Sequence, residues 1–374
     1  MNNNSCNNRK LALLAEVPVI LVLSLILIPV SCSSCRATTA TAVQYINFKN
    51  TTENGTDANT SLPSHNAQIL YSKGKELFGE NKYEQAIAYF DRALAAKPNN
   101  TNALDGKADA LSKLDRYEEA ISYYNKALSI EPSNVTILYS KANVLPYLGK
   151  YEDAIAVYDK ILAMNPHAPN AIGRKGLVLY DVGRSAEAVT YFDRVLATEP
   201  NNTDALFYKG LALDSLAKYG EAIAVYDKIL AMNPKNIDIL AGTAVDLSHL
   251  GKYEEAIKYF NKVLAIDPYR INVLINKAIA LGNLTRYNEA ITYFNKVLAI
   301  YPEEPITLNG KGKVLFKLGR YAEAITYFNK VLASKPSDIG FRMEVSKNKQ
   351  MALDALKTEH RYRLSELRNV TNND

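Results

Sequence analysis

Proline recurs through this sequence at a fixed interval. Eight prolines are each separated from the next by 34 residues: Pro98, Pro132, Pro166, Pro200, Pro234, Pro268, Pro302 and Pro336. A fixed period of this length indicates an array of like units, because one such unit cannot bury its apolar face without neighbours. The 374-residue chain is therefore expected to form one array, although its length alone would suggest two or three domains.

Each unit carries two apolar stripes. With the proline at position 32, the units begin at residues 67, 101, 135, 169, 203, 237, 271 and 305. Position 4 is Leu or Ile, position 8 is Gly or Ala and position 11 is Leu, a spacing that lines one face of a helix. Position 20 is Ala, position 24 is aromatic and position 28 is Leu in every unit, which predicts a second helix. The proline then ends that helix, since it has no N–H to donate.

The turn between the two helices is often Gly-Lys-Tyr or Gly-Arg-Tyr, as at residues 149–151 and 319–321. Glycine at this point can end the first helix in the left-handed conformation. Pro146 conflicts with the pattern, because it falls inside the first helix of the third unit and removes a hydrogen bond to the carbonyl of Ala142. We expect that helix to kink or to end a turn early.

The units resemble the tetratricopeptide repeat family in the small residue at position 8, Ala at 20, the aromatic at 24 and Pro at 32. The resemblance covers residues 67–338 as eight repeats. Two positions depart from the family pattern: position 4 is Leu or Ile instead of a large aromatic, and position 27 becomes Ile or Val after the second unit. The resemblance implies an all-α fold, a right-handed α-solenoid superhelix of antiparallel helix hairpins. It also implies a protein-binding module without a cofactor.

The N-terminal 42 residues are typical of a targeting segment. A basic n-region precedes an apolar run over residues 17–30, and Ala-Thr-Ala at 40–42 is a candidate cleavage site. Three alternatives stay open for residues 1–42: a cleaved signal peptide, an uncleaved membrane anchor, and a lipid anchor on Cys32. Each predicts that the protein is exported or membrane-anchored, with the repeats outside the cytoplasmic membrane.

The repeats are flanked by two further segments. Residues 43–66 are rich in Asn, Thr and Ser and lack an apolar period, which predicts a flexible linker. Residues 339–374 are expected to form a capping helix and a tail, because an array needs its last apolar face covered. The apolar stripe of the cap is Phe341, Val345, Ala352 and Leu356, and the sequence beyond it is charged.

Composition and motifs favour neither catalysis nor metal nor nucleic-acid binding. The net charge of +5 is spread over the whole chain rather than clustered in a basic stripe. All three cysteines precede the repeats and the four histidines are scattered, so neither a disulfide framework nor a metal site is expected. The sequence has no nucleophile elbow, phosphate-binding glycine loop or metalloprotease motif. We therefore expect a non-enzymatic protein with no metal and no cofactor.

The first helix of each unit has a second face, formed by positions 2, 5, 9, 12 and 13. In the family this face lines the concave groove, so it is where a partner is expected to bind. The predicted contact residues are Tyr71, Lys75, Phe78, Asp105, Asp109, Tyr139, Asn143, Tyr147, Leu177, Tyr180, Asp181, Asp204, Phe207, Leu211, Asp214, Asp238, Ile275, Ile279, Asn309, Lys313 and Phe316.

The middle of this face is acidic and aromatic. Units four to six place no lysine on it but hold Tyr180, Phe207 and Leu211 together with several aspartates. This favours a protein partner, or an extended or helical peptide, that is apolar with some positive charge. The alternative hypothesis is a structural or envelope-assembly protein whose repeats stack end to end, and the oligomeric state is left open.

Overall fold

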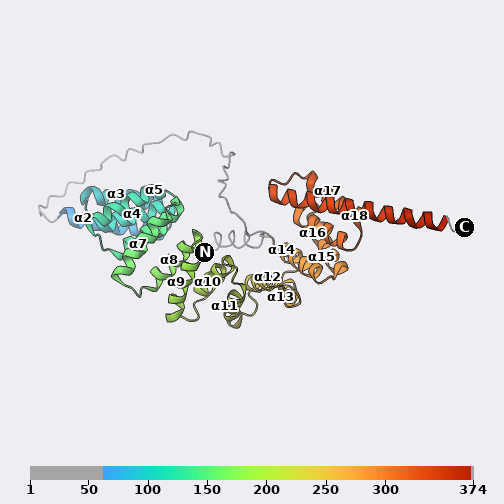
Figure 1. The fold of residues 1–374 in the computed structure, drawn as a ribbon. Coiled ribbons are helices and arrows are strands. Elements are labelled where there is room, and N and C mark those ends of the chain that lie inside the picture. The colour runs from blue at the N-terminus through green and yellow to red at the C-terminus, as the bar shows by residue number, and fades with distance from the viewer. Residues whose placement is uncertain (1–61, 372–374) are drawn as a thin grey trace, which may run out of the picture. The chain divides into compact units, whose positions relative to one another are not determined.

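The computed structural model describes residues 62–371, and Figure 1 shows them as a succession of helices. Within these residues every regular element is helical. No helix in that range is both long and apolar enough to cross a membrane. The predicted targeting segment 1–42 and most of the predicted linker 43–66 lie outside the described residues.

The described chain divides into two compact units, and residues 62–166 form the first. It holds three helix hairpins, which correspond to the first three repeats. They are α2 (Leu62–Gly79) with α3 (Tyr83–Ala96), α4 (Thr101–Lys113) with α5 (Tyr117–Ile130), and α6 (Val135–Val144) with α7 (Tyr151–Met164). Helix α2 begins at Leu62, so the last residues of the segment predicted as linker form its first turn.

Residues 167–371 form the second unit and hold five hairpins and a final long helix. The hairpins are α8 (Pro169–Asp181) with α9 (Ser185–Thr198), α10 (Thr203–Ser215) with α11 (Tyr219–Met232), α12 (Ile237–His249) with α13 (Tyr253–Ile266), α14 (Ile271–Asn283) with α15 (Tyr287–Ile300), and α16 (Pro305–Lys317) with α17 (Tyr321–Ala333). The final helix is α18 (Ile339–Thr371). The predicted all-α array of tandem helix pairs is confirmed.

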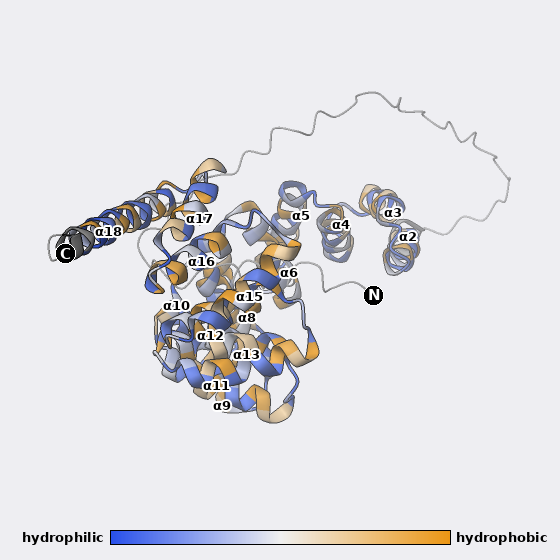
Figure 2. Cartoon of the chain, turned by 90° about the vertical axis from the view of Figure 1, so that its right-hand side faces the viewer, coloured by the Kyte–Doolittle hydropathy of each residue, from blue (hydrophilic) through white to orange (hydrophobic). Residues whose placement is uncertain are grey.

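The aromatic residue at position 24 is the centre of each repeat's core. Phe90 is 1% exposed, and its ring lies so close to Gly74 and Gly106 that a Cβ on either glycine would stand 2.7 Å from it. The ring therefore fills the space between the first helix of its own repeat and that of the next. Figure 2 shows the resulting pattern, with apolar and polar residues on different faces of the helices.

The turns inside the hairpins share one backbone conformation. Position 15 has a positive φ in all eight repeats: Asn81, Asp115, Gly149, Gly183, Ala217, Gly251, Thr285 and Gly319. The left-handed turn expected at the glycines is thus confirmed, and four repeats adopt it without glycine. A non-glycine residue pays a steric cost in this region, which the packing of the flanking helices must offset.

Pro146 shortens the first helix of the third repeat, as predicted. Helix α6 ends at Val144, and the chain continues as a 3-10 helix, η1 (Leu145–Leu148), before Gly149. The other first helices of the array run at least three residues longer. The ring of proline removes the amide proton that the α-helix would need at this point.

In three repeats a lysine at position 7 contacts both its own second helix and that of the preceding repeat. Lys277 Nζ donates to Asn261 Oδ1 in the preceding repeat and to the Tyr293 hydroxyl in its own, both at 2.5 Å. Its ammonium also lies over the Tyr293 ring, 4.0 Å from the centroid. Lys107 and Lys311 make the corresponding pairs of contacts. The arrangement joins second helices on either side of one first helix, and we call it the lysine bridge.

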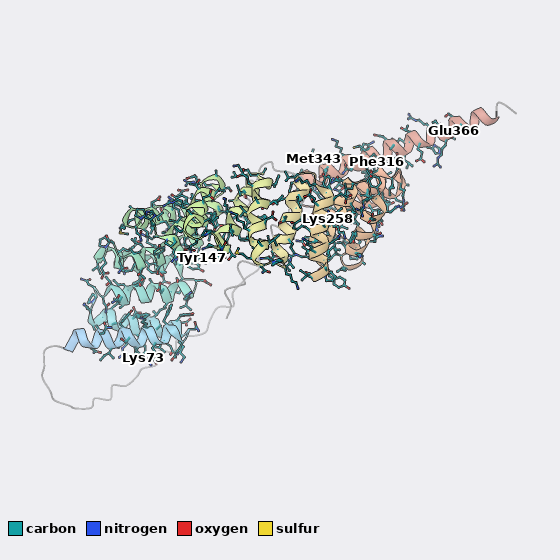
Figure 3. The ribbon with its side chains drawn as sticks, turned by 90° about the horizontal axis from the view of Figure 1, so that it is seen from below. Lys73, Tyr147, Lys258, Phe316, Met343 and Glu366 are labelled. Atoms are coloured by element: carbon teal, nitrogen blue, oxygen red, sulfur yellow. The ribbon has the colours of Figure 1, made fainter. Side chains whose placement is uncertain are left out.

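Helix α18 covers the end of the last repeat. Val345 and Ala352 are fully buried, and Phe341 and Leu356 are half-buried. Asp338 caps the helix by accepting a hydrogen bond from the Phe341 amide at 2.8 Å. Figure 3 shows Glu366 on the part of α18 that extends beyond the hairpins. The predicted capping helix with a charged end is confirmed.

Candidate partner-binding face

An apolar series runs along the first helices of the second unit. Position 9 is aliphatic in four consecutive repeats, as Leu177, Leu211, Val245 and Ile279, and each of these side chains is half-buried. We call them the aliphatic row. The remaining repeats have a polar residue at this position: Lys75, Asp109, Asn143 and Lys313. A partner with apolar side chains would therefore find its contacts in repeats four to seven.

Aromatic side chains adjoin the row between repeats four and five. Phe207 packs edge-on against Tyr208, with ring centroids 5.3 Å apart, and Tyr180 lies 6.3 Å from the same ring. All three side chains are half-buried. Sequence reasoning identified Tyr180 and Phe207 but missed Tyr208, because position 6 was not assigned to the binding face. An aromatic at a position otherwise occupied by small or polar residues was the available signal.

Two of the predicted aspartates are exposed on the helices that carry the row, and a third is less accessible. Asp181 closes α8 and Asp204 lies in the first turn of α10, and both are exposed. Asp238 forms an ion pair with Arg270 of the next repeat, with 2.5 Å between Oδ1 and Nη2. The acidic character predicted for this part of the face thus resides mainly in Asp181 and Asp204.

Three predicted polar residues are hydrogen-bonded to core tyrosines. Position 24 is tyrosine in only three repeats, and each hydroxyl donates to a first-helix side chain of its own repeat. The pairs are Tyr124 with Asp109 at 2.6 Å, Tyr158 with Asn143 at 2.7 Å, and Tyr226 with Asp214 at 2.6 Å. A buried hydroxyl needs such a partner. These three acceptors therefore have a structural role whether or not they also touch a partner.

The Tyr124–Asp109 pair gives a prediction. Tyr124→Phe alone is expected to cost about 1 kcal/mol of unfolding free energy, because it leaves the Asp109 carboxyl with one donor fewer. The double variant Tyr124→Phe/Asp109→Leu should recover that loss, because repeat four already combines Phe192 with Leu177. Urea unfolding of the two variants measures the difference. Equal losses in the single and double variants would contradict the pairing.

A second acidic cluster lies in the first unit. Burial, and then the charge of the nearby Asp109 carboxylate, raise the pKa of Asp105 to about 7. Burial also raises the pKa of Asp109, against hydrogen bonds from Tyr124 and Ser140 that lower it. Tyr71 faces both acids, and burial followed by their charges raises its pKa. Three predicted contact residues are thus brought together: Tyr71, Asp105 and Asp109. With a pKa of about 7, the Asp105 carboxyl is partly protonated near neutral pH.

Contacts with neighbouring helices limit how much the last repeats can offer a partner. Ile275 is only 8% exposed and packs with Leu274 and Val297. Asn309 is 5% exposed and contacts α18, where Asn348 donates to it at 3.4 Å. Lys313 forms an ion pair with Glu344 of the same helix. The cap thus occupies part of the predicted face in the eighth repeat.

Three other predicted aromatics each contact a tyrosine that begins a second helix. Phe78 packs edge-on against Tyr83 at 5.4 Å, and Phe316 packs against Tyr321 at 5.5 Å. Tyr147, labelled in Figure 3, is 65% exposed and stacks on Tyr117 at 4.8 Å. Tyr139 is half-buried and Lys75 is exposed. These residues are accessible, although they are not part of the aliphatic row.

Within the described part of the chain, no three His, Cys, Asp or Glu side chains are placed so that they could hold a metal ion. A cavity of about 240 Å³ lies between the start of α17 and α18, lined by residues that include Arg320, His360 and Arg363. Part of the positive charge that lines it is neutralised, because Arg320 forms an ion pair with Glu323 at 2.6 Å. The cavity is not on the first-helix face.

Family models match most of the described chain. A model described as tetratricopeptide repeat matches residues 139–188, 174–237 and 275–339, and a second with the same description matches 239–303. A model of the anaphase-promoting complex, cyclosome, subunit 3, matches residues 79–161. Among the curated proteins none matches this chain.

Solved structures share the fold at low sequence identity. The C-terminal part of a TPR repeat-containing protein from Cytophaga hutchinsonii aligns with a TM-score of 0.57 and 18% identity, over 64% of this chain and 98% of that one. PilW, a type IV pilus biogenesis factor, aligns at 0.47 and 24%, over 55% and 96%. YrrB, a TPR protein with an unusual peptide-binding site, aligns at 0.44 and 23%, over 50% and 95%. With eight helix hairpins in its described residues and the two repeat models that match more than half of its length, the chain belongs to the tetratricopeptide repeat family.

Proposed function

We propose that this protein is a non-catalytic scaffold that binds an apolar, positively charged segment of another protein on the first helices of repeats four to seven. The observation that carries the proposal is the aliphatic row. Four adjacent repeats present an aliphatic side chain at position 9, where the other four repeats have a polar residue. Apolar side chains half-buried in series provide contact area that a partner can remove from water.

Charge and aromatic content support the stated chemistry of the partner. Tyr180, Phe207 and Tyr208 adjoin the row, and aromatic side chains are the residues that most often dominate binding energy. The exposed acids Asp181 and Asp204 would attract cationic side chains and disfavour anionic ones. Together they favour a leucine- and lysine-containing amphipathic segment over an acidic one.

Localisation outside the cytoplasmic membrane is part of the proposal and rests on the sequence of residues 1–42. The alternative function, end-to-end stacking of repeats between molecules, is less well supported. Stacking would use the open side of α17, and α18 already covers that side through Val345 and Ala352. Stacking at that end of the array would therefore require the capping helix to be displaced.

The test uses two short fluorescent amphipathic peptides of the same length, one of leucine and lysine and one of leucine and glutamate. Fluorescence anisotropy with the full chain is expected to show tighter binding of the lysine peptide. Phe207→Ala should weaken that binding about tenfold, the loss of a single aromatic contact of hot-spot strength.

The matched control is Tyr269→Ala, because Tyr269 is 74% exposed in the turn before α14 and off the first-helix face. Its affinity should equal that of the unaltered chain. Equal losses in both variants, or no loss in either, would argue against binding at the aliphatic row. Equal binding of the two peptides would instead refute only the proposal that the partner is positively charged.

A further inference from the structure

Asp246 occupies a position that is apolar in most repeats. Position 10 is alanine or valine in six of the eight, glutamate in the first, and Asp246 in the sixth. The Asp246 side chain lies inside the array, and the residue is 3% exposed. A buried carboxyl in place of a small apolar residue is costly unless another group compensates it.

The compensating group is a second carboxyl. Asp214 at the end of α10 and Asp246 in α12 lie within hydrogen-bonding reach of each other. The Tyr226 hydroxyl donates to Asp214 Oδ2 at 2.6 Å, while Asp214 Oδ1 and Asp246 Oδ2 are buried without any other partner. Two ionised carboxylates would repel each other at this separation, whereas one proton held between them satisfies both groups.

No cation of the described chain takes the place of that proton. The ionisable groups that face the pair are Tyr226 and Tyr219 of α11. Neither can carry a positive charge, because a phenol loses a proton to become an anion. Tyr180 of α8 contributes only through Tyr226. His249 of α12 stacks on Tyr219 at 4.4 Å, and burial lowers its pKa, which favours the neutral ring. No charged group of α13 or α14 is among those that influence either carboxyl.

The junction around the pair lacks the lysine bridge. Position 7 of the sixth repeat is Thr243, whose hydroxyl donates to its own helix at the Ile239 carbonyl, 2.9 Å away. Asp227, at the position that accepts from lysine in other repeats, lies exposed on α11. The backbones of α10 and α12 also approach each other over a shorter stretch than those of α8 and α10 or of α12 and α14. The carboxyl pair therefore lies at a junction that has no lysine bridge.

We propose that the junction of repeats five and six is a proton-dependent switch, in which one proton shared by Asp214 and Asp246 holds α10 against α12. Loss of that proton places two like charges between the helices and separates them. Leu211 and Val245 of the aliphatic row belong to these same two helices, so their spacing changes with the pair. This regulation of partner binding rests on the proposed function, whereas the switch itself does not.

The direction of the pH dependence follows from burial. Burial, and then the charge of Asp214, raise the pKa of Asp246 to about 9, and burial raises that of Asp214 as well. The folded state thus keeps a proton that the unfolded chain has already released above an ordinary aspartate pKa. The pair holds the junction closed at neutral pH and opens it as the pH rises through the folded-state value.

Hydrogen exchange of the full chain, read by mass spectrometry at pH 6.5 and 9.5 and corrected for the intrinsic rate, tests the switch without a ligand. Protection of amides in α10 to α12 is expected to fall about tenfold at the higher pH. A tenfold change in the opening equilibrium corresponds to a difference of one pKa unit between the closed and the open state. Asp246→Asn should abolish the fall, because its amide donates to Asp214 at every pH. Peptides from α16 and α17 should show no such change.

Two further variants keep the test decisive. Asp246→Ala places the alanine of other repeats at position 10 and should also remove the pH dependence, whereas Asp227→Asn removes a nearby exposed charge and should retain it. A fall of the same size in Asp246→Asn, or a fall in α16 and α17 as well, would overturn the proposal. With the lysine peptide as probe, affinity should drop with pH only where Asp246 is intact. If that peptide binds at neither pH, the proposed function fails while the exchange result still stands.

Discussion

Gly210→Ala is expected to lower the free energy of unfolding by about 2 kcal/mol. A Cβ at this position would lie 2.2 Å from Cε1 and 2.6 Å from Cζ of the Tyr226 ring. The ring cannot easily retreat, because it is 2% exposed and its hydroxyl is bonded to Asp214. Overpacking of this kind costs about 1–3 kcal/mol. The higher helix propensity of alanine offsets about 1 kcal/mol of the steric penalty, and the expected loss is the difference between the two effects.

Gly242→Ala is the matched control, because it adds the same methyl group on the opposite side of the same ring. There the new Cβ would lie 3.8 Å from Tyr226 Cε2, an ordinary contact. We expect this variant to be more stable than the unaltered chain by up to about 1 kcal/mol, from helix propensity alone. Urea unfolding followed by circular dichroism measures both midpoints. Changes of the same sign in the two variants would refute the assigned role of the ring.

This contrast also shows what the sequence could predict. The sequence has a small residue at position 8 of every unit, and the structure shows that glycine there leaves room for the position-24 ring. The hairpins, the short α6 and the capping α18 followed from periodicity, proline and one apolar stripe, because each depends on local geometry. Repetition makes such inferences secure, since every repeat tests the same rule.

The polar contacts inside the array could not be predicted in the same way. The three side chains that accept from a core tyrosine do not occupy one position, since Asp109 and Asn143 stand at position 9 and Asp214 at position 12. Which acid reaches which hydroxyl depends on side-chain directions across a helix pair, which spacing alone does not give. Asp246 was missed because position 10 was assigned to neither apolar stripe. Its departure from alanine and valine was the visible signal.

Asp105→Asn is expected to raise the free energy of unfolding at pH 8 by about 2 kcal/mol. An ordinary aspartate has a pKa of 3.8, and burial with the charge of Asp109 raises that of Asp105 to about 7. One pKa unit corresponds to about 1.4 kcal/mol, and partial contact with solvent reduces the total to roughly half of the full value. Asparagine keeps the shape of the side chain and removes the buried charge.

The sign of the pH dependence separates this effect from a general change in packing. Between pH 4 and 7 the folded chain holds a proton on Asp105 that the unfolded chain has lost, so this carboxyl lowers stability progressively as the pH rises. The gain from Asp105→Asn should therefore be close to zero near pH 4, grow through that interval and stay constant above about pH 8. Glu118→Gln, which removes an exposed acid in the first turn of α5, should show no such growth. Urea unfolding across this pH range measures both variants, and a gain that is independent of pH would mean that the buried charge of Asp105 is not its cause.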